Sequence, residues 1–263
     1  MDLGLKDKRA LVTGASRGLG YATARLLAQE GCRVIINSRN EARIKSAAEK
    51  ISMETGVETQ GLPADLSLPS IPEKLVERAA LALGGLDLLL TNTGGPAPSA
   101  FEAVSEKLWL DSINLSFLSH VRLIRAALPH LRKSTAASVL TVTSIAVKQP
   151  LAYLVLSNSI RAATAGLTKS LAQELGRDAI RFNSILPGST RTERIQELMQ
   201  FRSRQNGTTI EEEAAKDAAA SALGRMAEPE EFAQAAVFLL SPASSYITGS
   251  MLLVDGGAYR GTW

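Results

Sequence analysis

The stretch LVTGASRGLG at residues 11–20 decides the fold class. It joins an apolar run to a helical pattern at 21–30 through three glycines, Gly14, Gly18 and Gly20. Glycines between a strand and a helix let backbone N–H groups approach a phosphate and let the helix pack closely on the strand. The helix N-terminus adds partial positive charge. The stretch therefore predicts a nucleotide-binding unit at the start of the chain.

Apolar runs and helical patterns alternate along the rest of the chain. Most of the apolar runs are continuous Val, Ile and Leu, as expected for strands of a parallel sheet covered on both faces. This alternation predicts one α/β domain over residues 1–263, a doubly wound parallel sheet (Rossmann fold) with helices on both faces. We expect strands at residues 9–13, 33–37, 58–63, 86–92, 138–143, 180–186 and 251–254, and helices at 21–30, 41–55, 69–83, 107–133, 158–175 and 229–240.

The segment at about 190–225 departs from this rhythm, because it is polar and charged. Since it leaves the carboxyl end of a strand, where open α/β sheets bind their ligands, we expect a helical flap over the site. A surface excursion without function is the alternative. The segment also carries a cluster of arginines, which forms either a solvated helix face or a weak rim for an anionic substrate: Arg191, Arg194, Arg202 and Arg204.

Composition excludes several classes of function. The net charge is only +3 and aromatic residues are 5% of the chain, so nucleic-acid binding is not expected. No apolar run approaches the ~18 residues of a membrane span, and the charged start is unlike a signal peptide. The single cysteine, Cys32, rules out an internal disulfide and favours a cytoplasmic protein. His120 and His130, expected at a surface or interface, lack metal-ligand spacing, so no metal site is predicted.

The end of the second predicted strand indicates which dinucleotide binds. An NAD enzyme places an acidic residue there to accept from the ribose 2′-hydroxyl, but residues 36–40 read INSRN, without a carboxylate. Arg17 in the glycine turn and Arg39 after the strand offer planar guanidinium groups that suit a 2′-phosphate. NADP(H) is therefore the predicted cofactor, although one or both arginines could simply be exposed.

Further motifs accompany the glycine turn: TNTGG at 91–95, ILPGSTRT at 185–192 and VDGG at 254–257. Together they resemble the short-chain dehydrogenase/reductase family from end to end, including its 3-oxoacyl-acyl-carrier-protein reductase-like branch. The resemblance implies an NADP(H)-dependent oxidoreductase acting on a carbonyl or alcohol substrate, as a dimer or tetramer. It assigns the cofactor to these residues: Gly14, Ser16, Arg17, Gly18, Leu19, Gly20, Ser38, Arg39, Asp65, Leu66, Asn92, Gly94, Arg161, Pro187, Gly188, Thr190 and Thr192.

The resemblance assigns catalysis to Ser144 and Asn114 but breaks at the YxxxK motif. The tyrosine position, thirteen residues after Ser144, is Ser157, and the lysine position is Arg161. An aliphatic hydroxyl is a far weaker acid than a phenol, whose pKa is about 10. Arginine keeps the charge and could hold ribose hydroxyls, but it stays protonated and cannot relay a proton. The proton donor is therefore altered.

Tyr153 is the candidate substitute for the missing phenol. A continuous helix would place it on the same face as Ser157, four residues later. Pro150 indicates instead that the helix starts late and leaves Tyr153 in the preceding loop, where it would line the pocket or pack. Three hypotheses remain open: an oxidoreductase with an altered proton donor or water, a redox-inactive NADP(H)-binding sensor, and a structural subunit.

Overall fold

A seven-stranded parallel sheet forms the centre of the protein. The computed structural model describes residues 1–262, and in it the strand order is β3-β2-β1-β4-β5-β6-β7. Every neighbouring pair is parallel. The predicted doubly wound sheet is confirmed. The strands are β1 (Arg9–Val12), β2 (Arg33–Ser38), β3 (Thr59–Pro63), β4 (Leu88–Thr91), β5 (Ser138–Val142), β6 (Arg181–Pro187) and β7 (Met251–Val254).

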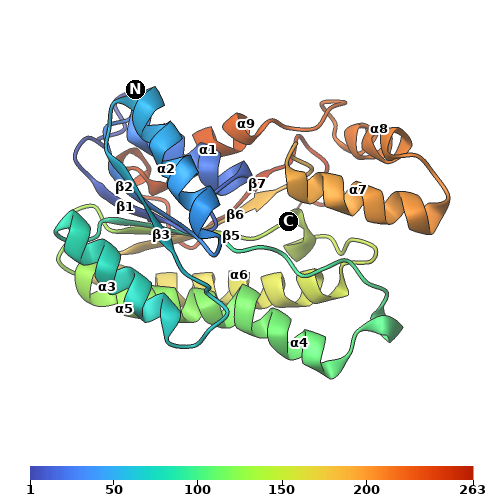
Figure 1. Cartoon of the computed structure of the whole chain (residues 1–263), viewed down its shortest axis with the longest axis horizontal. Coiled ribbons are helices and arrows are strands. Elements are labelled where there is room, and N and C mark those ends of the chain that lie inside the picture. Colours follow the sequence, from blue (N-terminus) through green and yellow to red (C-terminus); the bar gives the residue numbers. More distant parts are fainter. Residues whose placement is uncertain (263) are drawn as a thin grey trace.

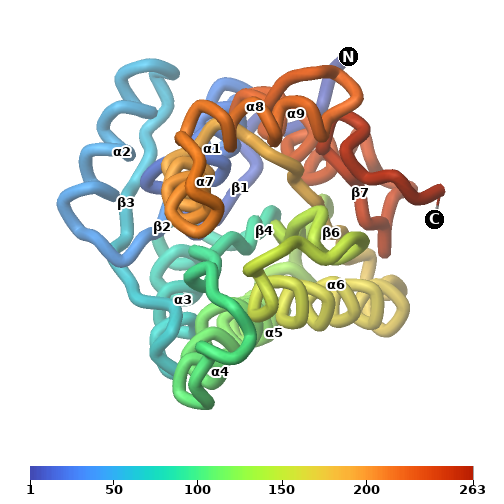
Figure 2. Tube along the Cα trace, turned by 90° about the vertical axis from the view of Figure 1, so that its right-hand side faces the viewer, coloured from blue at the N-terminus to red at the C-terminus, as the bar shows by residue number. Residues whose placement is uncertain are grey.

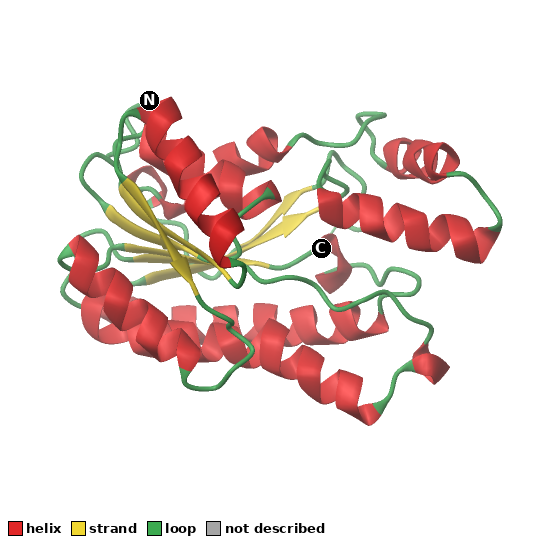
Figure 3. Cartoon of the chain, in the orientation of Figure 1, coloured by secondary structure: helices red, strands yellow, loops and turns green. Residues whose placement is uncertain are grey.

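Helices cover both faces of the sheet, as Figures 1 and 3 show. One apolar core lies between the sheet and α1, α2 and α9, and the other between the sheet and α3, α5 and α6. None of the helices within residues 1–262 has the length and apolarity needed to cross a membrane. The helices are α1 (Gly18–Gln29), α2 (Glu41–Thr55), α3 (Ile71–Leu83), α4 (Glu106–Ile113), α5 (Ser119–Leu131), α6 (Val155–Leu175), α7 (Glu193–Asn206), α8 (Ile210–Ala220) and α9 (Pro229–Leu240), with short 3-10 turns at Phe101–Ala103, Ile145–Val147, Gly176–Asp178 and Pro242–Ser244.

The chain reverses its winding direction between β1 and β4. The strands β1, β2 and β3 run toward one edge of the sheet, and β4 returns to the other side of β1. Ligands of open α/β sheets bind beyond the carboxyl ends of the strands at such a switch point. The sheet thus positions the glycine turn after β1 opposite the loop after β4.

The long helix expected at 107–133 is interrupted. A π-helical turn, Asn114–Leu118, joins α4 to α5. The helix expected from residue 158 begins earlier, at Val155, because the side chain of Asn158 bonds both the N–H and the carbonyl of Leu151 and so holds the preceding loop against the first turn. Both differences lie beside the candidate site.

The polar segment after β6 folds into α7 and α8. Gly207 closes α7 in the left-handed conformation (φ 65°), and Thr209 begins α8 with a capping box. In Figures 1 and 2 both helices lie on the same side of the sheet as α1 and α9. We refer to α7 and α8 as the flap.

Candidate active site

A pocket of about 470 Å³ lies where β1, β4, β5 and β6 end and α7 begins. Most of the residues expected to hold the nucleotide line it: Gly14, Arg17, Gly18, Leu19, Arg39, Asn92, Gly94, Arg161, Pro187, Gly188, Thr190 and Thr192. Ser16, Gly20, Ser38, Asp65 and Leu66 do not line it. Among the catalytic candidates, Ser144, Ser157 and Arg161 line the pocket, whereas Asn114 and Tyr153 do not.

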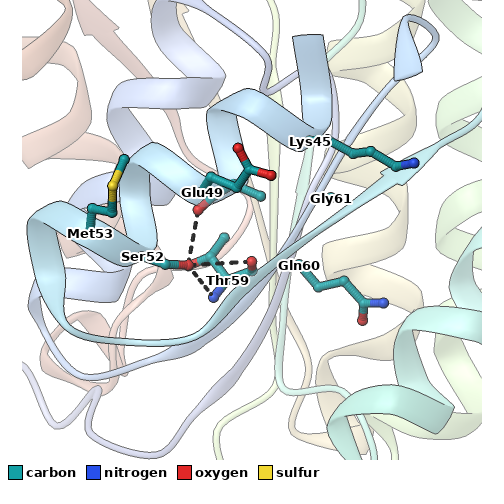
Figure 4. A pocket seen from close by; sticks show the side chains of 8 residues that line it. Lys45, Glu49, Ser52, Met53, Thr59, Gln60 and Gly61 are labelled. Carbon is teal, nitrogen blue, oxygen red and sulfur yellow. Dashed lines mark hydrogen bonds between the residues drawn. The ribbon is translucent and has the colours of Figure 1, made fainter. Parts of the chain in front are cut away.

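A second hollow, between α2 and β3, shares no residue with this pocket. Figure 4 shows that the Ser52 hydroxyl bridges the two elements. It donates to Ala48 O at 2.9 Å and accepts from Thr59 N at 2.9 Å. The polar atoms there hold the edge strand against α2, so we assign this hollow a structural role.

The glycine turn forms a backbone cradle. Gly14 has φ 60°, and a Cβ on it would lie 2.7 Å from Asn92 O; a Cβ on Gly20 would lie 2.5 Å from Gly14 O. Neither position accepts a side chain, so backbone N–H groups stay open to an anion at the start of α1. Thr13 Oγ1 donates to Asn92 O at 2.8 Å, and Asn92 Nδ2 donates to Gly14 O at 3.1 Å, which locks the turn to the loop after β4. The residues present fit a dinucleotide pyrophosphate.

The two arginines expected to bind a 2′-phosphate, Arg17 and Arg39, both line the pocket. Arg39 is exposed, lines the pocket and has no ion-pair partner within residues 1–262. Arg17 is already paired, with Glu193 of α7 and, at 3.7 Å, with Glu197. The two guanidinium groups are therefore not equivalent, and Arg39 is the more accessible to an anion.

Two of the expected cofactor residues, Asp65 and Ser38, are engaged within their own loops. Asp65 Oδ1 accepts from the Ser67 hydroxyl at 2.7 Å, while Ser38 Oγ donates to Asn40 O at 3.3 Å. Leu66 is buried. These side chains shape the edge of the site from outside the pocket.

The reaction side of the pocket is built on β5 and α6. Ser144 follows β5, and its Oγ accepts from Ala146 N at 3.1 Å. Ser157, in the first turn of α6, is 8% exposed, and its Oγ accepts from Arg161 Nε at 3.2 Å. Arg161 Nη1 donates to Val142 O at 3.1 Å and to Thr143 O at 2.8 Å, so the sheet fixes the guanidinium. Burial, and then the charge of Arg194, lower the pKa of Arg161 to about 10, which still leaves it protonated at neutral pH.

Asn114 does not line the pocket, and its side chain is bonded elsewhere. Its Oδ1 accepts from Arg122 Nη2 at 3.1 Å and its Nδ2 donates to Leu110 O at 3.2 Å, away from the pocket. Ser116 lies nearer the site instead: its Oγ donates to Gly94 O at 3.4 Å, and its carbonyl accepts from Thr164 Oγ1 at 3.2 Å. The π turn changes which residues face the sheet, and hydrophobic periodicity does not reveal such a turn.

Tyr153 precedes α6 in a left-handed turn with φ 61°. Its ring packs edge-to-face on Phe201 of α7, with centroids 5.7 Å apart, and its carbonyl accepts from Ser99 N. These contacts favour the packing role over the catalytic one, since the ring is engaged with the flap.

His120 departs from the surface position expected for it. The side chain is 1% exposed, on α5. Burial, and then the positive charge of Arg161, lower the pKa of His120 to about 3. Its Nδ1 has no hydrogen-bond partner within residues 1–262. A neutral imidazole therefore lies in the electrostatic field of the reaction side, and its sequence context, a polar residue in an apolar helix, gave no sign of burial.

The flap arginines are mostly neutralised. Arg202 pairs with Asp217 at 2.8 Å and Arg191 pairs with Glu228 at 2.8 Å. Arg194 donates to Pro96 O and lies 3.5 Å from Glu197. Of the cluster, Arg194 and Arg202 line the pocket and Arg191 and Arg204 do not.

Comparisons with known proteins agree with this geometry. The family model described as enoyl-(acyl carrier protein) reductase matches residues 14–259. Dehydrogenase/reductase SDR family member 4 of Bos taurus is 33% identical over 255 residues, which cover 97% of this chain and 88% of the relative. The 3-oxoacyl-[acyl-carrier-protein] reductase FabG of Vibrio cholerae is 31% identical, covering 98% of this chain and 99% of the relative.

Solved structures give the same result. L-sorbose reductase from Gluconobacter frateurii, complexed with NADPH and L-sorbose, superposes with a TM-score of 0.94 at 30% identity, covering 99% of this chain and all of the other. The sheet order, the glycine cradle and these matches lead to one conclusion: the chain belongs to the short-chain dehydrogenase/reductase family of oxidoreductases.

Proposed function

We propose that the protein is an NADP(H)-dependent oxidoreductase that interconverts a small carbonyl compound, such as a 3-oxoacyl thioester, and its alcohol. One observation carries the proposal: a single pocket joins the glycine cradle and Arg39 to Ser144, Ser157 and Arg161. The NADPH-bound state of a structural neighbour supports the choice of cofactor.

The chemistry is divided between cofactor and chain. When bound, NADPH supplies a hydride to the carbonyl carbon. Gly14 and Gly18 would hold the phosphates through their backbone, and Arg39 would pair with the 2′-phosphate. Ser144 and Ser157 orient the substrate oxygen through their hydroxyls.

Arg161 replaces acid catalysis with electrostatic stabilisation. Its Nε–H bonds the Ser157 oxygen, which leaves the Ser157 proton available to the substrate oxygen and polarises that hydroxyl. A fixed positive charge beside developing negative charge stabilises the transition state without passing a proton. Solvent then supplies the proton to the alkoxide, and bulk buffer neutralises the hydroxide that is left, because Ser157 and Arg161 are too weakly acidic near neutral pH to give up a proton.

The flap and the assembly complete the proposal. We assign α7 and α8 the role of covering the ligand in a single-domain, cytoplasmic protein. On α6 the small residues Ala162, Ala163 and Gly166 are exposed, and on α4 Leu110 is 55% exposed. These surfaces support a homodimer or homotetramer with closed symmetry. A monomer in light scattering at micromolar concentration would contradict this.

The decisive experiment pairs a titration with turnover. NADPH and NADH binding are measured first, and NADPH oxidation is then followed against ketones, diketones, oxo acids and 3-oxoacyl thioesters. Tight NADPH binding with turnover supports the enzyme. Binding of NADPH without turnover of any carbonyl compound favours a redox-inactive NADP(H)-binding sensor, a hypothesis that the missing Tyr–Lys pair supports. Absence of binding favours a structural subunit.

A further inference from the structure

Two guanidinium groups converge on one spot in the pocket, above Gly95. A Cβ on Gly95 would lie 3.4 Å from Arg194 Nη2 and 3.5 Å from Arg161 Nη2. These are ordinary van der Waals distances, so a methyl-sized group fits at this spot in contact with both guanidinium groups. Arg161 comes from α6 and Arg194 from α7, so the spot lies between the reaction side and the flap.

Arg161 has hydrogen-bonding capacity left at this spot. Its Nε and Nη1 are used by Ser157 and by the backbone at the end of β5. Its Nη2 donates to no residue within 1–262. A guanidinium fixed by the protein through Nε and Nη1 can still donate a charge-assisted hydrogen bond from Nη2 to an anionic oxygen such as that of a carboxylate.

The pairing of the arginines in the pocket also indicates an anion at this spot. Most arginines that line it have a carboxylate within 4 Å, as Arg202 has Asp217 and Arg225 has Glu231. Within residues 1–262, the lining arginines without one are Arg39 and Arg161. Arg39 faces the nucleotide end, where the cofactor phosphate would neutralise it. Arg161 lies at the reaction end, and no anion is yet assigned to it. Its neighbour Arg194 also donates to Pro96 O and lies 3.5 Å from Glu197, which is half exposed.

The geometry points to a carboxylate-bearing substrate, held between Arg161 and Arg194 above Gly95. The inference rests on the proposed function and narrows its substrate to short oxo acids. Because Arg161 Nε bonds Ser157 while Nη2 of the same guanidinium faces the spot, the carboxylate lies close to the carbonyl oriented by Ser157. That spacing favours 2-oxo and 3-oxo acids over ketones without a charge.

A binding experiment tests the site without turnover. The probe is oxamate, a planar carboxylate related in shape to 2-oxo acids, titrated by calorimetry into the protein saturated with NADP⁺, so that the phosphate sites are already filled. Arg194→Gln should weaken oxamate binding by about 10–100-fold, as expected for loss of a charge-assisted contact. The matched control is Arg191→Gln, a flap arginine that does not line the pocket, and it should leave oxamate affinity unchanged.

A second variant fills the spot and keeps both charges. Gly95→Ala introduces a methyl group between the two guanidinium groups and should lower oxamate affinity, with NADP⁺ affinity recorded alongside as a check on the cradle. In turnover, kcat/KM for 2-oxobutanoate or 3-oxobutanoate should exceed that for butanone, and Arg194→Gln should remove most of this preference.

The outcomes separate the two proposals. If oxamate fails to bind the NADP⁺ complex, or binds Arg194→Gln as well as Arg191→Gln, the anion site is wrong even if neutral ketones are reduced. If oxamate binding depends on Arg194 but no carbonyl compound oxidises NADPH, the site stands and the proposed reductase activity is wrong.

Discussion

The two ends of the pocket differ in whether backbone or side chains form them. At the nucleotide end the glycine turn presents backbone, and its glycines are fixed by close approach: a Cβ at Gly20 would meet Gly14 O at 2.5 Å. At the reaction end the contacts come from the side chains of Ser144, Ser157 and Arg161. Side chains can be exchanged without moving the sheet, whereas the cradle cannot lose its glycines. The fold can therefore keep a cofactor site while the side chains at the reaction end differ, which is why family membership alone does not give the reaction.

The largest expected effect comes from restoring the family pair at the reaction end. A positioned general acid contributes about 10²–10⁴-fold to rate. The double change Ser157→Tyr with Arg161→Lys should therefore raise turnover of a neutral ketone or diketone within that range and barely change NADPH affinity. Arg161→Ala alone should weaken cofactor binding, because it removes the fixed charge on the reaction side of the pocket.

Native turnover is the check on this prediction. If the parent protein already reduces its best substrate at tens per second, above the typical enzyme median of about 10 s⁻¹, it has a proton donor that this geometry does not supply. Tyr153→Phe then tests whether Tyr153 is that donor. We expect no loss of activity, because the Tyr153 ring packs on Phe201. Abolished activity would show that Tyr153 donates the proton.

At the nucleotide end, Arg39→Ala should cost NADPH affinity specifically. A charge-assisted arginine–phosphate bond contributes about 1.5–3 kcal/mol, so the affinity for NADPH should fall roughly 10–150-fold while that for NADH stays the same. Arg43→Ala, on an exposed position of α2 outside the pocket, is the control. Equal affinities of the parent protein for NADPH and NADH would end the assignment of NADP(H).

Sequence reasoning succeeded where local chemistry determines structure. The glycine turn and the strands followed from spacing and apolar runs, because each depends on a few adjacent residues. It failed where the path of a helix decides which side chain faces the site. In the π turn, Ser116 bonds Gly94 O beside the pocket, whereas the Asn114 side chain accepts a hydrogen bond from Arg122. Likewise, His120 is buried because of how α5 packs in the fold, and the residues near it in the sequence do not predict that burial.

The reaction end should also make stability depend on pH through His120. Its pKa is about 3 in the folded protein, against an ordinary value of 6.5 for histidine. Below pH 6.5 the unfolded chain takes up a proton that the folded protein does not, so stability falls as pH falls toward 3. The loss is about 1.4 kcal/mol per pH unit, or at most about 2 kcal/mol between pH 6.5 and 5.

Chemical denaturation of the parent protein and of His120→Asn at pH 6.5 and pH 5 measures this loss in the free energy of unfolding. The variant should show a smaller difference between the two pH values, whatever its absolute stability, and His130 cancels because both proteins contain it. Identical pH dependence in the two proteins would show that His120 takes up its proton in the folded state, and the reaction end would then tolerate more positive charge than its geometry implies.

The smallest expected effect distinguishes the two arginines of the nucleotide end. Arg17 pairs with Glu193 and Glu197, and these side chains are about half exposed, so the interaction is worth no more than about 1 kcal/mol. A 2′-phosphate must compete with these carboxylates for Arg17, whereas Arg39 has no such competitor within residues 1–262. Arg17→Ala should therefore cost less NADPH affinity than Arg39→Ala.

Glu193→Gln should raise NADPH affinity by up to about fivefold, the equivalent of that 1 kcal/mol, and leave NADH affinity unchanged. Calorimetric titration of the three variants with both cofactors measures these differences. If Arg17→Ala proves the more damaging and Glu193→Gln has no effect, the carboxylates of α7 do not hold Arg17 in solution, and Arg17 rather than Arg39 is the main contact of the 2′-phosphate.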